Sequence, residues 1–243
     1  MRVFGIAGKK QVGKDTTADN IAKLLSDMRV KKLSFAKPLK DFVEVAFSIP
    51  KRHLWGSDSQ KNYPLCTWGE IFTSGALERY TKESHALLTA REILQVVGTD
   101  VMRQGNLDFL QPPFAGACRA FVEEKFGAGH KPYNELWVDL MVMEVKVLAA
   151  RNEAEVVAIP DVRFLNEVEG IRKMAGTPIR LYRDTGAKDS IPHASELELD
   201  QMSDSLFDYV LYEHENRNLG ELKSFAVKVL QSEGLLPVGG FGV

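Results

Sequence analysis

Short apolar runs rich in β-branched and aromatic residues alternate along this chain with longer stretches in which apolar residues recur at helical spacing. The β-prone runs lie at 2–7, 30–35, 155–160, 177–183 and 208–212. Strands that alternate with helices are typical of a parallel sheet with crossover helices. We therefore expect an α/β fold, with a central parallel sheet of about five strands flanked by helices.

A long segment separates the second β-prone run from the third. Turn-forming residues cluster within it at 57–64 and 126–133, and either loop could act as a lid over a substrate. The rest of the segment shows helical spacing. It predicts helices at 38–47, 68–80, 90–104, 114–126 and 134–151.

The chain is long enough for one core with an inserted lobe, since its 243 residues are 44% apolar and 26% charged. We expect the inserted lobe to bind the substrate, because the helical segment interrupts the alternation of strands and helices. The expected domains are a phosphate-loop core at 1–50 and 151–232, a helical insertion or lid at 51–150, and a flexible tail at 233–243.

The first β-prone run leads into a loop with two glycines and a lysine. Residues 8–14 read Gly-Lys-Lys-Gln-Val-Gly-Lys, which is the spacing of a phosphate-binding loop. The glycines let backbone N–H groups turn inward, and Lys14 adds a positive charge that can reach the β- and γ-phosphates. Because a strand precedes the loop and a helical pattern over 14–28 follows it, we predict that the chain binds ATP here.

Asp15 stands where Ser or Thr usually follows the lysine and gives its hydroxyl to Mg²⁺. A carboxylate at this position suits the positive end of the helix dipole and could bind Mg²⁺ directly or through water. Thr16 or Thr17 would then supply the hydroxyl contact. A simple acid in the first helical turn is the alternative, and both readings can hold.

Composition and charge exclude several classes of protein. No apolar run approaches the roughly 20 residues that span a bilayer, and the N-terminus lacks the pattern of a signal peptide, so we expect a cytoplasmic location. A formal net charge of −2 gives no general attraction to nucleic acid or anionic lipid, which favours small phosphorylated substrates over polymers as partners. Cys66 and Cys118 are too few and too far apart for a disulfide framework or a zinc site.

The third β-prone run delivers an acid and a base to the end of a buried strand, at Asp161 and Arg163. Ligands of parallel sheets gather at the carboxyl ends of the strands. Asp161 could bind Mg²⁺ through water, orient Lys14 or receive a substrate hydroxyl, while Arg163 could stabilise charge on the transferred phosphoryl group. A structural Asp–Arg pair that caps the next helix is the alternative. Glu167 could hold Arg163 or the substrate, or be a solvated acid in the first turn.

Within the inserted segment, Arg91 and Gln95 are four residues apart and share one face of a predicted helix. They could bind a phosphate and the edge of a base. We expect the helix to stop at a polar break formed by Gly98, Thr99 and Asp100, where Gly98 allows close approach and the other two offer hydrogen bonds. A surface face with a helix cap is an equally good explanation of these residues.

Two further residues have both a functional and a structural interpretation. Trp137 lies among apolar residues, which favours a place in the core over a platform that stacks on a base. Lys40 follows the second β-prone run, from where its amine could meet a monophosphate. Taken alone it would be a solvated lysine.

Five segments, in the same order, closely resemble tailed-phage deoxynucleoside monophosphate kinases. They are the phosphate loop with its Gly-Lys-Asp-Thr-Thr-Ala-Asp ending, 36–41 (Ala-Lys-Pro-Leu-Lys-Asp), 94–100 (Leu-Gln-Val-Val-Gly-Thr-Asp), 137–138 (Trp-Val) and 160–163 (Pro-Asp-Val-Arg). The resemblance spans residues 2 to about 230, and the acid after the phosphate-loop lysine is itself a family trait. It implies a nucleoside-monophosphate-kinase-like fold and transfer of the γ-phosphoryl group of MgATP to deoxynucleoside 5′-monophosphates for DNA precursor synthesis, in the host cytoplasm for a phage protein. It is also compatible with a homodimer.

The resemblance implies roles for individual residues. It places the ATP phosphates at Gly8, Lys10, Gly13, Lys14, Asp15, Thr16 and Thr17, with Mg²⁺ at Asp15 and Thr16. It places the deoxynucleotide at Lys40, Lys61, Gln95, Gly98, Thr99, Asp100, Trp137, Asp161, Arg163 and Glu167. The residues expected to act in catalysis are Lys14, Arg91, Asp161 and Arg163, where Arg91 helps to hold phosphate.

The chain departs from the family pattern at two places. Gln11 replaces an arginine, which removes one phosphate contact, and 58–61 lacks another arginine, for which Lys61 is the substitute. Residues 193–196 resemble a further family segment and predict a helix start with His193 or Ser195 as its cap. Because a phosphate loop does not identify the acceptor, another small-molecule kinase, acting on a coenzyme precursor or a sugar acid, stays open as an alternative. So does a non-catalytic nucleotide-binding regulator.

Overall fold

The computed structural model describes residues 1–183, 194–213 and 219–238 of the chain. Contacts within it divide the chain into two compact units. Unit 1 comprises Met1–Phe35 and Val138–Val243, and unit 2 comprises Ala36–Trp137. The functional domains that we expect from the sequence have limits after residues 50 and 150, which differ from the limits of these units. Those functional domains remain a prediction.

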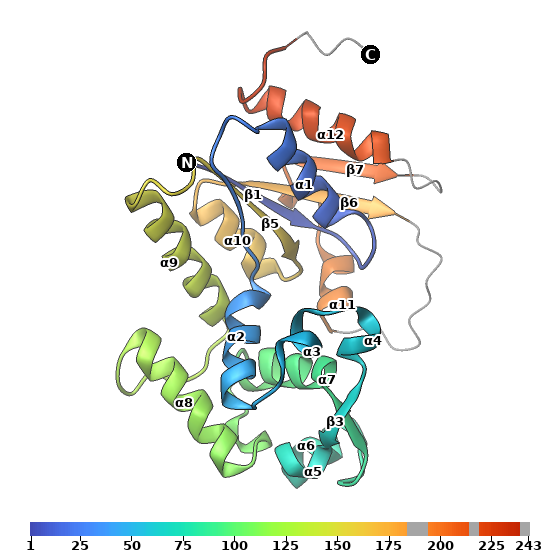
Figure 1. Cartoon of the computed structure of the whole chain (residues 1–243), viewed down its shortest axis with the longest axis vertical. Coiled ribbons are helices and arrows are strands. Elements are labelled where there is room, and N and C mark those ends of the chain that lie inside the picture. The colour runs from blue at the N-terminus through green and yellow to red at the C-terminus, as the bar shows by residue number, and fades with distance from the viewer. Residues whose placement is uncertain (184–193, 214–218, 239–243) are drawn as a thin grey trace. The chain divides into compact units, whose positions relative to one another are not determined.

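Unit 1 is built on a parallel sheet of five strands in the order β2-β5-β1-β6-β7 (Figure 1). The strands are β1 (Arg2–Ala7), β2 (Val30–Lys32), β5 (Val156–Val162), β6 (Thr177–Arg183) and β7 (Tyr209–Glu213). Each of them falls on one of the β-prone runs. The α/β fold with about five parallel strands, as predicted from the alternation of apolar runs and helical stretches, is therefore confirmed.

Helices cover both faces of this sheet (Figure 1). They are α1 (Lys14–Leu24), α9 (Leu136–Ala150), α10 (Leu165–Lys173), α11 (Ala194–Gln201) and α12 (Leu219–Ser232), with a 3-10 turn, η3, at Asp204–Leu206. Because neighbouring residues of a strand point to opposite faces, β1 contributes to two cores. Phe4 packs in a core with residues of α1 and α12, and Val3 in another core with residues of α9, α10 and α11.

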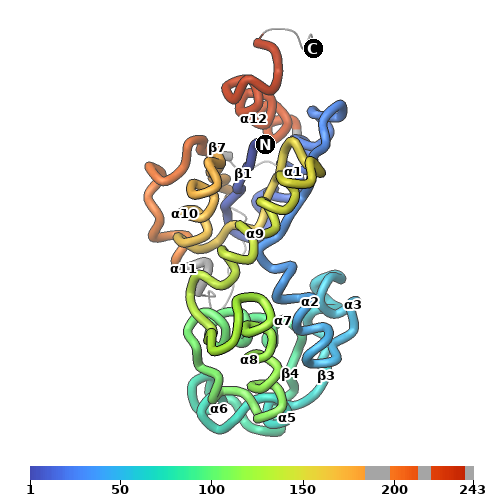
Figure 2. Tube along the Cα trace, turned by 90° about the vertical axis from the view of Figure 1, so that its left-hand side faces the viewer, coloured from blue at the N-terminus to red at the C-terminus, as the bar shows by residue number. Residues whose placement is uncertain are grey.

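Unit 2 is mostly helical. Its elements are α2 (Ala36–Ala46), α3 (Lys51–Trp55), α4 (Asp58–Lys61), β3 (Pro64–Thr67), α5 (Trp68–Ile71), α6 (Ser74–Tyr80), β4 (Leu87–Thr89), α7 (Ala90–Gln95), the π-helical segment η1 (Val96–Val101), the 3-10 turn η2 (Leu107–Phe109) and α8 (Pro112–Phe126). Helices α2, α3 and α7 are neighbours within the unit (Figure 2).

Three predictions for the inserted segment are wrong. An antiparallel pair, β3 and β4, lies where no strand was expected. The helix predicted over 68–80 is two helices, because the chain after α5 extends at Phe72 and Thr73 before α6 begins. Part of the expected loop at 57–64 is the short helix α4, which a Ser57 capping box starts. Among the helices of the described residues, none combines the length and the apolar character needed to cross a lipid bilayer.

Candidate functional site

The loop between β1 and α1 has the backbone of a phosphate-binding turn. Gly8 and Gly13 adopt φ angles of 153° and 101°, which residues with a side chain rarely adopt. A Cβ added at Gly8 would also lie 2.7 Å from the backbone oxygen of Leu181. Glycine is therefore required at the start of the loop, where β1 and β6 run side by side.

Lys14 is the first residue of α1, and its side chain turns back into the loop. The buried ammonium donates hydrogen bonds to the carbonyl oxygens of Gly8 and Lys9, both at 2.6 Å. The positive charge thus lies inside the curve of the loop, beside the N-terminal end of α1, where the helix dipole also favours an anion. The positive charge and the helix end are therefore arranged in a way that suits an anion.

The residues after Lys14 differ in how open they are. The Asp15 side chain is 84% exposed, with its carboxylate 3.8 Å from the Lys32 ammonium. Thr17 is buried and its hydroxyl donates to the Gly13 carbonyl at 3.1 Å, so that hydroxyl is already engaged. Thr16 is half-buried. Of the two threonines, Thr16 is therefore the better placed to meet a ligand.

Within the described parts of the chain, no group of three or more His, Cys, Asp and Glu side chains is gathered as a metal cage. Mg²⁺ at a nucleotide site needs no such cage, because it takes one or two protein oxygens and completes its shell with phosphate and water. The open carboxylate of Asp15 and the hydroxyl of Thr16 are hard oxygen donors at adjacent positions. The residues present therefore fit Mg²⁺ bound together with a nucleotide.

A pocket lies beside the loop, lined by residues of the loop itself, of β6 and of α11. Arg183, at the end of β6, reaches the loop from this side and donates from Nη1 to the Gln11 carbonyl at 3.4 Å. Its Nε is buried and has no partner among the described residues. The family resemblance led us to expect an arginine at position 11, where this chain has Gln11. The guanidinium of Arg183 lies beside that position.

Asp161 and Glu167 both bind backbone N–H groups. The Asp161 carboxylate accepts from the Ser34 hydroxyl at 2.5 Å and from the Phe35 N–H at 3.0 Å, which ties the end of β5 to the chain after β2. Buried Glu167 accepts from the backbone N–H groups of Arg163 and Phe164, at 2.8 and 3.2 Å, and so caps α10. The Arg163 guanidinium makes no hydrogen bond or ion pair with a described residue.

The segment from Gly98 to Asp100 is not the polar break that we expected. The helix of α7 continues through it as η1, in which the Met102 N–H bonds to the Val97 carbonyl, five residues back. Asp100 is buried, and accepts from Arg79 Nε at 3.3 Å and from the Tyr80 hydroxyl. Burial, and then the hydrogen bond to this carboxylate, raise the pKa of Tyr80. These contacts satisfy the Asp100 carboxylate inside the protein, so it is not the solvated group that we expected at a polar break.

Trp137 lies in the core of unit 2, with 3% of its surface exposed. Its indole Nε1 donates to the Gly98 carbonyl at 3.0 Å, a bond that the π-helical widening of η1 leaves room for. A Cβ at Gly98 would lie 2.5 Å from a methyl carbon of Leu39 in α2. Trp137 and Gly98 are therefore brought together, and the core interpretation of Trp137 agrees with its burial.

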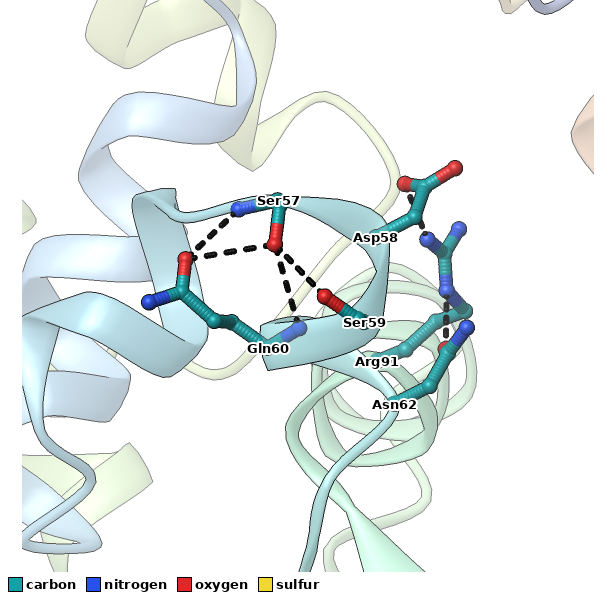
Figure 3. A network of polar contacts seen from close by, with 6 residues as sticks. All are labelled: Ser57, Asp58, Ser59, Gln60, Asn62 and Arg91. Atoms are coloured by element: carbon teal, nitrogen blue, oxygen red, sulfur yellow. Dashed lines mark hydrogen bonds and ion pairs between the residues drawn. The ribbon is translucent and has the colours of Figure 1, made fainter.

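Arg91 projects from α7 toward α4 (Figure 3). Its Nη2 donates to Asp58 Oδ1 and its Nε to Asn62 Oδ1, both at 2.7 Å. Gln95 lies one turn further along α7 and is half-buried, as are Lys61 and Lys40. The Lys40 ammonium stands 4.2 Å from the centre of the Trp55 ring, a cation–π contact.

The predicted site residues divide between the two units. Unit 1 carries Gly8, Lys10, Gly13, Lys14, Asp15, Thr16, Thr17, Asp161, Arg163 and Glu167. Unit 2 carries Lys40, Lys61, Arg91, Gln95, Gly98, Thr99, Asp100 and Trp137. The predicted cap residue His193 lies outside the described residues, as does the Ser195 side chain; helix α11 begins at Ala194.

Comparison with known proteins gives the family. A protein of Acanthamoeba polyphaga mimivirus named "Putative deoxynucleotide monophosphate kinase" is 30% identical over 200 residues, which are 82% of this chain and 82% of that protein. This chain belongs to the deoxynucleotide monophosphate kinase family. The tailed-phage source stays a prediction. No protein-family model matches. The solved dephospho-CoA kinase from Campylobacter jejuni aligns over 97% of this chain and 100% of its own, with a TM-score of 0.44 and 17% identity.

Two features of this family member were missed from the sequence. Arg183 ends an apolar strand and has no motif around it, so only the pairing of β6 with β1 brings it beside the loop. Asp58 and Asn62 lie in a segment that we expected to be a loop. Their spacing of four residues is the one signal that could have placed both on one side of a short helix.

Proposed function

We propose that this chain transfers the γ-phosphoryl group of ATP to deoxynucleoside 5′-monophosphates, giving the diphosphates used in DNA precursor synthesis. One observation carries the proposal: in a member of the deoxynucleotide monophosphate kinase family, the Lys14 ammonium lies inside a glycine-bounded loop at the start of a helix. That arrangement suits a bound polyphosphate, because backbone N–H groups and a fixed positive charge can act on it together.

On the donor side, the N–H groups of the loop and Lys14 would bind the β- and γ-phosphates of ATP, with Lys10 and Arg183 as further cations. Asp15 and Thr16 would hold Mg²⁺, which supplies neutralising charge at the phosphate oxygens when bound. Because Thr17 already donates to Gly13, we assign it to the stability of the loop rather than to a ligand.

On the acceptor side, Arg91 and Lys40 would bind the 5′-phosphate, with Lys61 as an additional cation. Gln95 and Thr99 would hydrogen-bond the nucleoside. The polar atoms of the buried residues Trp137 and Asp100 are already bonded within the protein. These two residues would therefore fix the conformation of η1 and would not contact the deoxynucleotide directly. Asp161 and Glu167 would position the ends of β5 and α10, from which Arg163 extends.

The reaction forms a bond from an oxygen of the acceptor phosphate to the γ-phosphorus and breaks the bond from that phosphorus to the β–γ bridging oxygen. The electron pair of the broken bond leaves with ADP. Because the attacking oxygen is already anionic, no general base is required, and positioning and charge neutralisation carry the rate. Arg163 has an uncommitted guanidinium among the described residues and is our candidate for stabilising charge on the phosphoryl group in transit.

The direct test is to incubate the protein with MgATP and a panel of ribo- and deoxynucleoside monophosphates, and to measure the diphosphates that form. We expect turnover with at least one deoxynucleotide. Failure with every deoxynucleotide would refute the proposal, and phosphorylation of a coenzyme precursor or sugar acid would identify a different kinase. Sedimentation of the same sample tests the homodimer with which the family resemblance is compatible.

A further inference from the structure

Helix α4 is a short element without a hydrophobic anchor. None of its four residues, Asp58–Lys61, is buried. Polar contacts hold its first turn instead: the Gln60 N–H donates to Ser57 Oγ at 3.4 Å, and the Ser57 N–H donates to Gln60 Oε1 at 2.9 Å (Figure 3). The chain reaches this cap through Gly56, where a Cβ would lie 2.1 Å from the Arg52 carbonyl oxygen. No core packing explains why α4 is formed.

A buried histidine holds the other end of α4. His53 Nε2 accepts a hydrogen bond from Arg52 Nε at 3.0 Å, so its Nδ1 carries the ring proton. That Nδ1 lies 2.8 Å from the Gln60 carbonyl oxygen and therefore donates to it. The His53 ring also stacks on Tyr63, which follows the helix. Helix α4 is thus fixed at both ends.

Helix α4 and its C-cap residue Asn62 together present two oxygen acceptors to one arginine. Asp58 takes Nη2 of Arg91 and Asn62 takes its Nε, so the edge of the guanidinium that carries these two nitrogens is occupied. Nη1 has no bonding partner in the described part of the chain. The edge formed by Nη1 and Nη2 remains open, and two parallel N–H groups on such an edge match two oxygens of a phosphate.

We propose that Asp58 and Asn62 are positioning residues, which hold the plane of Arg91 so that its open edge receives the 5′-phosphate of the acceptor. The proposal rests on the function proposed above, in which Arg91 binds that phosphate. The Asp58 side chain is 52% exposed and that of Arg91 34% exposed, and ion pairs between such groups contribute little to folding stability. The contacts instead orient the Arg91 side chain, and an arginine that is already ordered loses less conformational freedom when the phosphate binds.

The test compares steady-state kinetics of variants with a deoxynucleotide that the wild type accepts. Asp58→Ala should raise the KM for the deoxynucleotide about three- to ten-fold, the effect of freeing one long side chain. The kcat and the KM for ATP should stay within about twofold of wild type. Asn62→Ala should act in the same direction, and Asp58→Asn, which keeps an acceptor oxygen for Nη2, should restore the KM to within about twofold.

Asp108→Ala is the matched control, because Asp108 is another exposed acid of unit 2 and its side chain has no hydrogen bond or ion pair among the described residues. It should leave the deoxynucleotide KM unchanged. Arg91→Ala should raise that KM more than either partner variant does. An unchanged or lowered KM in Asp58→Ala would overturn the proposal, the lowered value showing that the carboxylate competes with phosphate. An equal loss of ATP and deoxynucleotide affinity, with a lowered Tm, would show a purely structural role.

A second readout separates this inference from the proposed function. Calorimetric titration of the deoxynucleotides measures their Kd without turnover. If no deoxynucleotide is phosphorylated, the proposed function fails, and the inference still stands or falls on whether Asp58→Ala weakens deoxynucleotide binding three- to ten-fold relative to wild type and Asp108→Ala. If the wild type also binds no deoxynucleotide, both are wrong. If turnover occurs and only the Asp58 effect is missing, the proposed function survives and the inference does not.

Discussion

The ammonium of Lys14 donates a hydrogen bond to the carbonyl oxygen of Gly8, six residues earlier, at 2.6 Å. The bond joins the two ends of the phosphate loop and keeps the charge of the lysine inside it. The positive φ angles of Gly8 and Gly13 give the loop its curve, and the buried ammonium of Lys14 lies within that curve.

Replacement of this cation should remove catalysis. We expect Lys14→Ala to lower kcat by about a thousand-fold or more, since the charge that acts on the phosphates in transit is lost. A coupled assay of ADP release measures the rate, and circular dichroism checks that the fold persists. Lys23→Ala, which removes an exposed lysine from the same helix, is the control and should be fully active. Retained turnover in Lys14→Ala would contradict the assignment of this loop as the phosphate-binding loop.

A methyl group at Gly8 should damage both stability and nucleotide binding. The added Cβ would lie 2.7 Å from a backbone oxygen, and the φ angle of 153° is unfavourable for alanine. We expect Gly8→Ala to lower the free energy of unfolding by about 1–3 kcal/mol and to weaken ATP binding. Thermal unfolding with and without MgATP measures both effects.

The control for this change is Gly116→Ala. Gly116 lies in α8 with no atom within 4 Å of an added Cβ. Alanine there should be neutral or stabilise by about 0.5–1 kcal/mol, because it favours the helix. If both variants behave alike, the steric account of Gly8 is wrong.

Trp137 can be tested as a hydrogen-bond donor against a role as a stacking platform. Trp137→Phe keeps an aromatic ring and removes the N–H that binds the Gly98 carbonyl. Because a buried carbonyl then lacks its partner, the free energy of unfolding should fall by about 1–3 kcal/mol, as urea denaturation would measure. The deoxynucleotide KM should rise with it. Unchanged stability together with an unchanged KM would contradict the positioning role of this bond.

The buried thiol of Cys118 predicts a pH dependence. Burial raises the pKa of Cys118 to about 12 from an unfolded value of 9.0. Between these values the unfolded chain has lost the thiol proton and the folded chain has kept it, so the unfolding free energy falls as pH rises from about 9 to about 12. Urea denaturation across this range measures the decline.

The matched variant is Cys118→Ala, in which the decline attributable to this thiol should disappear. Tyr182, whose pKa is raised to about 12 chiefly by burial and then by its bond to Asp204, contributes a decline in the same direction that the variant keeps. An identical pH profile in wild type and variant would show that the thiol does not contribute.

The parallel sheet, the phosphate loop and the end of β5 could be predicted because their signals are local. Five apolar runs separated by helical patterns specify the strands, and Gly8, Gly13 and Lys14 belong to one short motif. The family resemblance rests on such local motifs as well. The expected break at Gly98 failed because a glycine in a polar turn and a glycine packed against Leu39 look alike in one sequence.

The sequence by itself determined the α/β fold and the glycine-bounded loop around Lys14, because strand period, helix period and loop spacing are properties of neighbouring residues. Only the tertiary structure decided that Arg183 stands beside Gln11, that Trp137 bonds to Gly98, and that Asp58 and Asn62 hold Arg91. Each of these pairs joins positions at least 29 residues apart. Their geometry depends on how helices and strands pack, and the pattern of apolar and polar residues along the chain does not determine that packing.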